Sequence, residues 1–165
     1  MWVMDQIAAI RRGGDEAHEA ALALGLLIER EKVHRPTGDD GGISVILDDE
    51  LAARRLSPSE LQTAVDELLA YIHQAEQPHP MAVWALSKSY DERIVPDLIN
   101  LLKRTMTAPA AEHLSYQALV GMINIGMGSP HEAAALETIR QASVQGHGQV
   151  QETAAQYLAE MGGTA

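Results

Sequence analysis

The stretch that decides the fold runs from Ala82 to Lys103 and reads AVWALSKSYDERIVPDLINLLK. Its first five residues, AVWAL, are echoed by SYQAL at Ser115 to Leu119, which is an offset of 33 residues along the chain. A looser copy, AAQYL, occupies Ala154 to Leu158. Self-similarity at a fixed period of this length is typical of helical-repeat proteins, so each copy is predicted to be a short helix of a repeating unit.

A second apolar segment follows the first two copies. DERIVPDLINLLK follows the first copy and SPHEAAALETIR follows the second, with Leu136 and Ile139 in the places of Leu98 and Leu101. Apolar residues recur three and four positions apart in both segments, which indicates helices. The repeating unit is therefore predicted to be helix, tight turn, helix. Such a hairpin cannot bury both of its apolar sides alone, so the hairpins are expected to stack.

Two sets of side chains are expected to shape this stack. Small residues let neighbouring helices approach closely, and larger aliphatic residues fill the layers between them. The small residues are Ala82, Ala85, Ala118, Gly121, Ala134, Ala135, Ala154 and Ala155. The aliphatic residues are Leu98, Leu102, Leu119, Ile123, Leu136, Ile139 and Leu158.

The pattern resembles the HEAT-like repeats found in phycobilisome lyases and in many bacterial adaptor proteins. In that family a short first helix ends in Ala-Leu, an Asp and an Arg shape the turn, and Val-Pro opens the second helix. The matching residues here are Ala85, Leu86, Asp91, Arg93, Val95, Pro96, Leu98, Ile99, Leu101 and Leu102. The resemblance is good over residues 81–104 and looser over 112–161, where the second copy lacks the Asp-x-Arg turn and the Val-Pro pair. It implies a HEAT-like α-α superhelix, a short solenoid of antiparallel helix hairpins whose clearest repeats lie in residues 80–161.

The first half of the chain also predicts helices. One is expected from about Met4 to Arg12 and a second from Asp15 to Lys32, with a break at the intervening glycines. A third is expected to begin after Ser57, because Ser57 and Glu60 have the spacing of a capping box, and to end near residue 74. These hairpins could be degenerate repeats that cap the stack, so residues 1–165 are predicted to form one all-α helical-repeat domain.

Residues 33–44 separate the second and third of these helices. They contain HRPTGDDGG, a cluster of turn-forming residues without an apolar period, which predicts a flexible acidic loop. A short β-branched run, Ile43 to Leu47, follows it. Asp48, Asp49 and Glu50 then favour the start of a brief helix, because carboxylates at a helix N-terminus oppose the helix dipole.

The charge of the chain limits the class of partner. The 165 residues include 23 acidic and 12 basic side chains, a net charge of −11, and no cysteine. This acidity argues against nucleic-acid binding, which depends mainly on Lys and Arg, and it favours a basic protein partner. The first residues do not resemble a signal peptide, and the longest apolar run is too short to cross a bilayer. We therefore expect a cytoplasmic protein that does not bind membranes.

Acidic residues concentrate between residues 37 and 80, a segment that contains nine Asp or Glu residues but only two arginines. Such a surface could steer a basic partner or could simply keep the protein soluble. If the stack curves, the helix expected over residues 94–106 would add polar residues to a groove. The candidate partner-binding residues are Asp39, Asp40, Asp48, Asp49, Glu50, Asp66, Glu67, Asp97, Asn100, Lys103 and Arg104. The aromatic residues Trp2, Trp84, Tyr90 and Tyr116 are candidate anchors, although Trp84 is better placed for the core.

No motif points to catalysis, a metal or a cofactor. His73, Glu76 and His79 could converge but lack the spacing of a zinc site, and the acidic loop lacks the spacing of a calcium loop. Ser87, Ser89 and Ser115 have no nucleophile elbow around them, and GMGS at residues 126–129 lacks the lysine of a phosphate-binding loop. These glycines are better explained as the end of one helix before a Ser129-Pro130 cap of the next.

The leading functional hypothesis is a non-catalytic protein-protein interaction module. A specific form is a bacterial immunity or antitoxin-type protein that covers the active cleft of a basic toxin. The alternative, which the resemblance implies, is a lyase-like or chaperone-like protein that holds a small molecule or prosthetic group in its groove. A homodimer whose stack ends pair also stays open, because both ends of the chain carry apolar residues.

Overall fold

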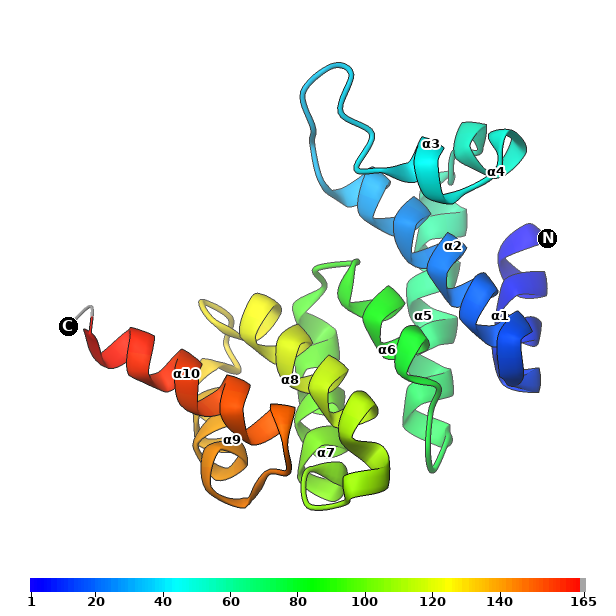
Figure 1. The fold of residues 1–165 in the computed structure, drawn as a ribbon. Coiled ribbons are helices and arrows are strands. Elements are labelled where there is room, and N and C mark those ends of the chain that lie inside the picture. The colour runs from blue at the N-terminus through cyan, green and yellow to red at the C-terminus, as the bar shows by residue number, and fades with distance from the viewer. Residues whose placement is uncertain (164–165) are drawn as a thin grey trace. The chain divides into compact units, whose positions relative to one another are not determined.

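The chain is helical throughout the part that the structure describes. A computed structural model describes residues 1–163. Within that range the regular elements are ten α-helices and two short 3-10 turns, with no strand (Figure 1). The predicted all-α class is confirmed.

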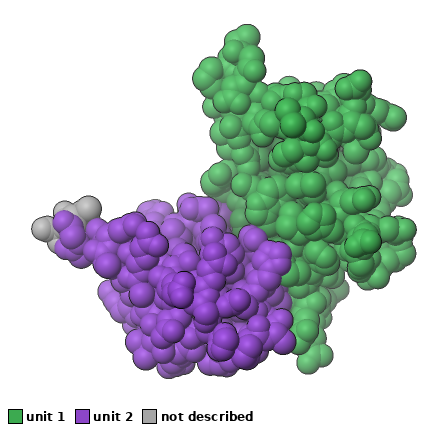
Figure 2. Space-filling model, in the orientation of Figure 1, with its two compact units in different colours: residues 1–90 green, residues 91–165 purple. Residues whose placement is uncertain are grey.

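The contacts within the chain gather into two compact units. Unit 1 comprises residues 1–90, and unit 2 begins at Asp91 (Figure 2). The boundary falls inside residues 81–104, the stretch with the best resemblance to a HEAT-like repeat, so the two helices of that predicted hairpin belong to different units. The single repeat domain over residues 1–165 stays a prediction.

Unit 1 is built on one central helix. Its elements are α1 (Trp2–Arg12), α2 (Gly14–Lys32), α3 (Ile43–Ile46), α4 (Asp49–Ala53), α5 (Pro58–Gln74) and α6 (Pro80–Ser87). Helix α2 packs against α1, α5 and α6, so its residues from 23 to 28 are buried on every side. The first helix begins at Trp2, two residues before the expected start, and the break at Gly13 requires the positive φ of 81° that glycine adopts readily.

The start of α5 is the capping box that the sequence predicts. Glu60 N donates to Ser57 Oγ at 3.1 Å, and Ser57 N donates to Glu60 Oε2 at 2.9 Å. Two backbone donors at the end of the helix are thereby satisfied by two side chains. The helix runs to Gln74, as expected from its apolar period.

The loop between α2 and α3 is shorter than expected, because residues 43 and 44 belong to α3. The β-branched run there forms one helical turn. The carboxylate of Asp40 accepts from the backbone N–H groups of Gly42 and Ser44, at 2.9 and 3.0 Å, and so satisfies donors at the start of this turn. A strand would need a partner to pair with, and the described residues contain none.

Unit 2 contains four longer helices joined by tight turns. They are α7 (Val95–Thr105), α8 (Glu112–Gly126), α9 (Glu132–Gln145) and α10 (Gln149–Gly163), with 3-10 turns at Glu92–Ile94 and Pro109–Ala111. Helix α7 packs on α8 and α9, while α10 packs on α8 and α9. Neighbours in sequence thus form the hairpins α7–α8 and α9–α10, and the two hairpins lie against each other.

Most of the residues expected between the helices of unit 2 are indeed buried. Leu98, Leu102, Leu119 and Ile139 have no exposed surface. The small residues Ala134 and Ala155 were expected to contact neighbouring helices, but both are exposed. They lie on helices α9 and α10, next to Ala135 and Ala154, which fill the buried positions instead.

Two turns of unit 2 depend on single side chains. Asp91 accepts from the backbone N–H of Arg93 at 3.0 Å and pairs with its guanidinium at 2.7 Å, so both residues stabilise the turn before α7. Ser129 differs from the prediction, because α9 begins at Glu132 with His131 in the N-cap position. The Ser129 hydroxyl donates to Gly126 O at 2.7 Å and also accepts from His131 N at 3.1 Å, so it caps the turn before α9 without being the N-cap residue of the helix.

Candidate functional site

The most exposed large apolar side chain of unit 1, Val45, lies on α3 beside a second exposed residue, Ile46. Val45 is 88% exposed and Ile46 is 51% exposed, whereas Ile43 in the same turn is 3% exposed. A single helical turn can bury only one of its sides, and Ile43 lies on the buried side of α3. Val45 and Ile46 are left facing water, which is unusual for a neighbouring pair of β-branched residues.

Acidic side chains flank this apolar pair on both sides in sequence. Asp39 and Asp40 precede it in the loop, and Asp48, Asp49 and Glu50 follow it at the start of α4. All five are exposed. We use the name α3–α4 surface for Val45, Ile46, Asp48, Asp49 and Glu50.

Three of these carboxylates also hold the backbone in place. Asp48 caps α4 by accepting from Leu51 N at 2.9 Å, and Asp39 accepts from Gly41 N at 2.9 Å. The pKa of Asp40 lies below its usual value because Ser44 and Gly42 donate hydrogen bonds to its carboxylate. Asp49 and Glu50 make no hydrogen bond or ion pair with the described residues and are therefore the freest charges of the surface.

Asp66 and Glu67, the two other acidic candidates of unit 1, lie on α5. Asp66 accepts a hydrogen bond from Gln62 at 2.8 Å, and Glu67 pairs with Arg11 of α1 at 3.3 Å. Glu67 therefore connects two helices of unit 1 and is less available to a partner than the sequence suggests.

The four remaining candidates belong to unit 2. They lie on α7 and are Asp97, Asn100, Lys103 and Arg104. Asn100, Lys103 and Arg104 are exposed, and Asp97 is half-buried. The acidic candidates and these polar ones are thus divided between the two units.

The aromatic candidates are largely covered. Trp2 is half-buried with the guanidinium of Arg54 at 4.7 Å from its ring centroid, and Trp84 and Tyr116 are also half-buried. Tyr90 is 48% exposed and has a φ of 50°, the one positive φ of a residue other than glycine in the described chain. Trp84, expected in the core, packs its ring against Gly25 of α2 but stays half-buried, with Lys88 Nζ at 5.0 Å from the ring centroid.

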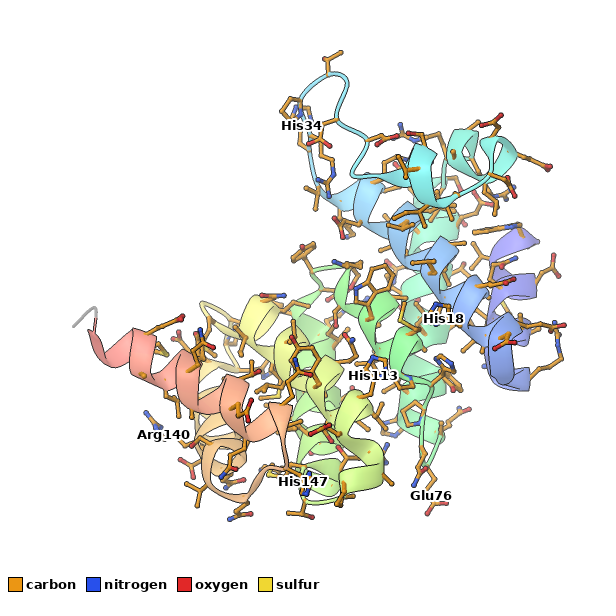
Figure 3. All side chains as sticks on the ribbon, in the orientation of Figure 1. His18, His34, Glu76, His113, Arg140 and His147 are labelled. Atoms are coloured by element: carbon orange, nitrogen blue, oxygen red, sulfur yellow. The ribbon has the colours of Figure 1, made fainter. Side chains whose placement is uncertain are left out.

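A cleft lies beside the loop, at the end of α2, and sequence reasoning did not point to it. Its volume is about 540 Å³, and its charged lining is mixed, with the cations Arg30, Lys32, Arg35 and Arg55 and the carboxylates Glu31, Asp39 and Asp40. His34 also lines it, and Figure 3 shows this histidine in the loop that follows α2. The sequence signal was weak, because these residues lie scattered among acids in a segment that is acidic overall.

Ion pairs fix most of the charged groups around this cleft. Arg55 donates to both carboxylate oxygens of Glu31 at 2.8 and 2.9 Å, and these hydrogen bonds hold the pKa of Glu31 below its usual range. Arg35 pairs with Glu29, which also binds Lys88 Nζ at 2.9 Å. Helix α2 is thereby connected to the loop, to the segment before α5 and to the end of α6.

The histidines are dispersed rather than clustered. Residues 1–163 contain no group of three or more His, Asp or Glu side chains that could hold a metal ion. His79 accepts from Met81 N through Nδ1 at 3.1 Å and so caps α6, while its ring lies edge-on to that of His18, with the centroids 6.4 Å apart. Figure 3 shows His113 on α8 and His147 in the turn before α10.

The serine candidates are part of the helix framework. Ser115 is fully buried on α8, where its hydroxyl lies 2.8 Å from Thr105 Oγ1. Ser87 and Ser89 bond to the backbone carbonyls of Val83 and Leu86. The hydroxyls of all three serines therefore form hydrogen bonds within or between helices.

None of the helices in residues 1–163 combines the length and the apolar character needed to cross a bilayer. No protein-family model, no curated protein and no solved structure matches this chain.

Proposed function

We propose that this protein is a non-catalytic interaction module that binds a basic protein through the α3–α4 surface. The observation that carries the proposal is the exposure of Val45 and Ile46 between acidic residues. Stable interfaces have an apolar centre and a polar rim, and the α3–α4 surface offers that arrangement on a small scale.

Charge complementarity supports a basic occupant. Asp49 and Glu50 are exposed and form no ion pair with the described residues, so a partner's Lys or Arg can approach both. Opposite charges on a rim speed association and set register, and salt screens them. The predicted partner segment therefore carries one or two aliphatic residues for Val45 and Ile46, flanked by basic side chains.

We further propose that the helices form HEAT-like repeats in a short solenoid. The packing of α7 on α9 and of α8 on α10, which brings corresponding helices of the two hairpins of unit 2 together, supports this proposal. The contact between Asp91 and Arg93 at the turn before α7 supports it as well. A HEAT-like array suits an adaptor, because repeat stacks present extended binding surfaces.

A specific form of this function is an immunity or antitoxin-type protein in the cytoplasm. Its acidic surface would cover the substrate cleft of a basic toxin such as a nuclease, whose cleft must itself be basic to hold phosphates. The net charge of −11 agrees with this form. A second copy of the chain is the competing occupant of the α3–α4 surface. The oligomeric state of the purified protein distinguishes this second copy from a basic protein partner.

Affinity capture at low and high salt tests the proposal, with three variants compared to the wild type. Val45→Ser with Ile46→Ser removes the apolar centre, and Asp49→Asn with Glu50→Gln removes the unpaired charges. A matched control carries Asp15→Asn, an exposed acidic change at the start of α2.

The expected result is a basic protein that the wild type retains in a fixed ratio at low salt. High salt and the charge variant should weaken retention, the apolar variant should abolish it, and the control should leave it unchanged. Equal retention by all variants, or no retained protein, would contradict the proposal. A dimer of the wild type that the apolar variant dissociates would assign the surface to a second copy.

The second candidate function is the binding of a small molecule or prosthetic group. The cleft of about 540 Å³ beside the loop favours it, because small-molecule sites are concavities of about this size.

A further inference from the structure

The side chain of Arg30, in the last turn of α2, is only partly hydrogen-bonded. Its Nη1 donates to Ala52 O at 2.7 Å and fixes one edge of the guanidinium. Its Nε and Nη2 are buried and have no hydrogen-bond partner among the described residues. A buried donor left without a partner is unfavourable, more so when it is charged, and nearly all buried donors in folded proteins have a partner.

The two unpaired nitrogens form one fork. Nε and Nη2 lie on the same edge of a guanidinium, and their N–H groups point in nearly the same direction. This edge matches two oxygens of a carboxylate or a phosphate, and such paired bonds are among the strongest that proteins make. The bond to Ala52 O holds the fork in a defined orientation before any ligand arrives.

The nearby carboxylates are committed elsewhere. Glu31 receives both hydrogen bonds of Arg55, and Glu29 pairs with two other cations. Asp40 accepts from backbone N–H groups of its own loop. Three carboxylates therefore lie near Arg30, but none of them accepts a hydrogen bond from its Nε or Nη2.

Two cavities border Arg30. The smaller, of about 10 Å³, has room for roughly one water molecule between α2 and the loop. The larger is the cleft of about 540 Å³, which Arg55 also lines. Burial and the positive charge of Arg55 lower the pKa of Arg30, so an anion between the two guanidinium groups would relieve both effects.

We propose that this cleft binds a small molecule through an oxyanion, a carboxylate or a phosphate, that is held by the Nε and Nη2 fork of Arg30, with Arg55 beside it. The proposal rests on the second function above and is independent of the α3–α4 surface. The fork has no exposed surface, so the loop must shift to admit the ligand. Gly38 and Gly41, which adopt positive φ, are the places where the backbone can do so most easily.

The test is a titration of the full chain with inorganic phosphate and, separately, with citrate, at constant ionic strength. Affinity is measured by calorimetry, and the amide signals of Gly38 and Gly41 are followed by NMR. The variants are Arg30→Lys, which keeps the charge but removes the fork, and Arg55→Gln. The control is Arg12→Gln, an exposed arginine of α1 that pairs with Glu16.

At least one probe is expected to bind and to shift the two glycine signals. Arg30→Lys should weaken that binding by roughly 10-fold to 100-fold, because a hydrogen bond to a charged group contributes about 1.5–3 kcal/mol. Arg55→Gln should weaken it by a smaller factor, and Arg12→Gln should leave it unchanged. Binding of phosphate alone or of citrate alone would identify which oxyanion the cleft takes.

Failure of both probes to bind the folded wild type would overturn the proposal and leave the fork to a water molecule. Equal affinity of the wild type and Arg30→Lys would overturn it as well. If Arg30→Lys does not fold, the decision falls to Arg55→Gln and to the loop signals of the wild type. No loss in Arg55→Gln together with unshifted glycine signals would then reject the site. None of these outcomes bears on capture of a protein through Val45 and Ile46.

Discussion

Gly25 of α2 lies directly under the indole of Trp84 on α6. A Cβ atom on Gly25 would overlap the ring, approaching Trp84 Cε3 to 2.9 Å and the Cα of Ala85 to 3.0 Å. The helix here has ordinary backbone geometry, so it is the closeness of α6 that requires glycine. This contact fixes how near the two helices of unit 1 can come, and it explains why the most apolar stretch of the chain contains a residue with a poor helix propensity.

The first prediction concerns this contact. Gly25→Ala should lower the free energy of unfolding by about 1–3 kcal/mol, because the indole must move in a packed interior. Chemical denaturation followed by circular dichroism measures the change. Gly162→Ala is the matched control, since that glycine is also in a helix and has open space around it. The control should be neutral or slightly stabilising, and a stabilising Gly25→Ala would show that the contact is looser than described.

The second prediction is a pH dependence that involves Glu31. Hydrogen bonds from Arg55 lower the pKa of Glu31 in the folded state below its unfolded value of about 4.3. The stabilisation is therefore present above that pH and is lost as the pH falls through the folded pKa. Because Arg55 is 67% exposed, solvent reduces the effect to about 0.5–1 kcal/mol at pH 7.

Glu31→Gln should therefore be less stable than the wild type at pH 7, and the difference should shrink at acid pH. Urea denaturation at several pH values measures it. Glu16→Gln removes an ion pair with Arg12 in which both side chains are exposed, and it should change stability by less than about 0.5 kcal/mol. A difference between Glu31→Gln and wild type that persists at acid pH would rule out the carboxylate as its cause.

The third prediction concerns the buried hydroxyls of unit 2. Thr105 and Ser115 lie 2.8 Å apart, and each also bonds to a backbone carbonyl of its own segment. Thr105→Val and Ser115→Ala should each cost about 0.5–1.5 kcal/mol, with a coupling energy in the double variant of at least about 0.5 kcal/mol. A double-mutant cycle in denaturant measures the coupling. Strict additivity would mean that the contact between α7 and α8 contributes nothing beyond packing.

The fourth prediction compares two positions that correspond in the proposed repeat. Leu98 has no exposed surface, whereas Leu136, its counterpart on α9, is half-buried. Leu98→Ala should cost about 2–5 kcal/mol, and Leu136→Ala should cost less than half as much, because less surface is removed from contact. Equal losses would indicate that α9 packs in unit 2 as tightly as α7 does.

The sequence alone was sufficient for the local structure. The spacing of Ser57 and Glu60 predicted a capping box, and the spacing of apolar residues predicted α1, α2 and α5 within a few positions. These features depend on residues three or four apart, so the chain carries them without reference to distant contacts. The copies at Ser115 to Leu119 and Ala154 to Leu158, predicted as short helices, instead belong to the 15-residue helices α8 and α10. Ser129 is not the N-cap residue of α9, because that helix begins at Glu132 and the Ser129 hydroxyl bonds to Gly126 O and to His131 N within the turn before it.

Local composition could not predict the arrangement in space. Ile43 is buried while Val45 and Ile46 are exposed, although all three are similar residues within one short run. Ala134 and Ala155 are exposed beside Ala135 and Ala154, which are buried, because the rotation of a helix about its axis is set by its neighbours. Burial of a given side chain is a property of the surface against which it packs.

The candidate sites divide in the same way. The acidic composition pointed to Asp48, Asp49 and Glu50, but only the fold decides which carboxylates are engaged in caps and ion pairs. The cleft beside the loop and the unpaired fork of Arg30 were not detectable, because hydrogen bonding between residues 22 positions apart exists only after folding. The sequence determined the helices, their caps and the net charge, since these depend on near neighbours and composition. The tertiary structure decided which side chains remain free, since that depends on which groups the folded chain has already paired.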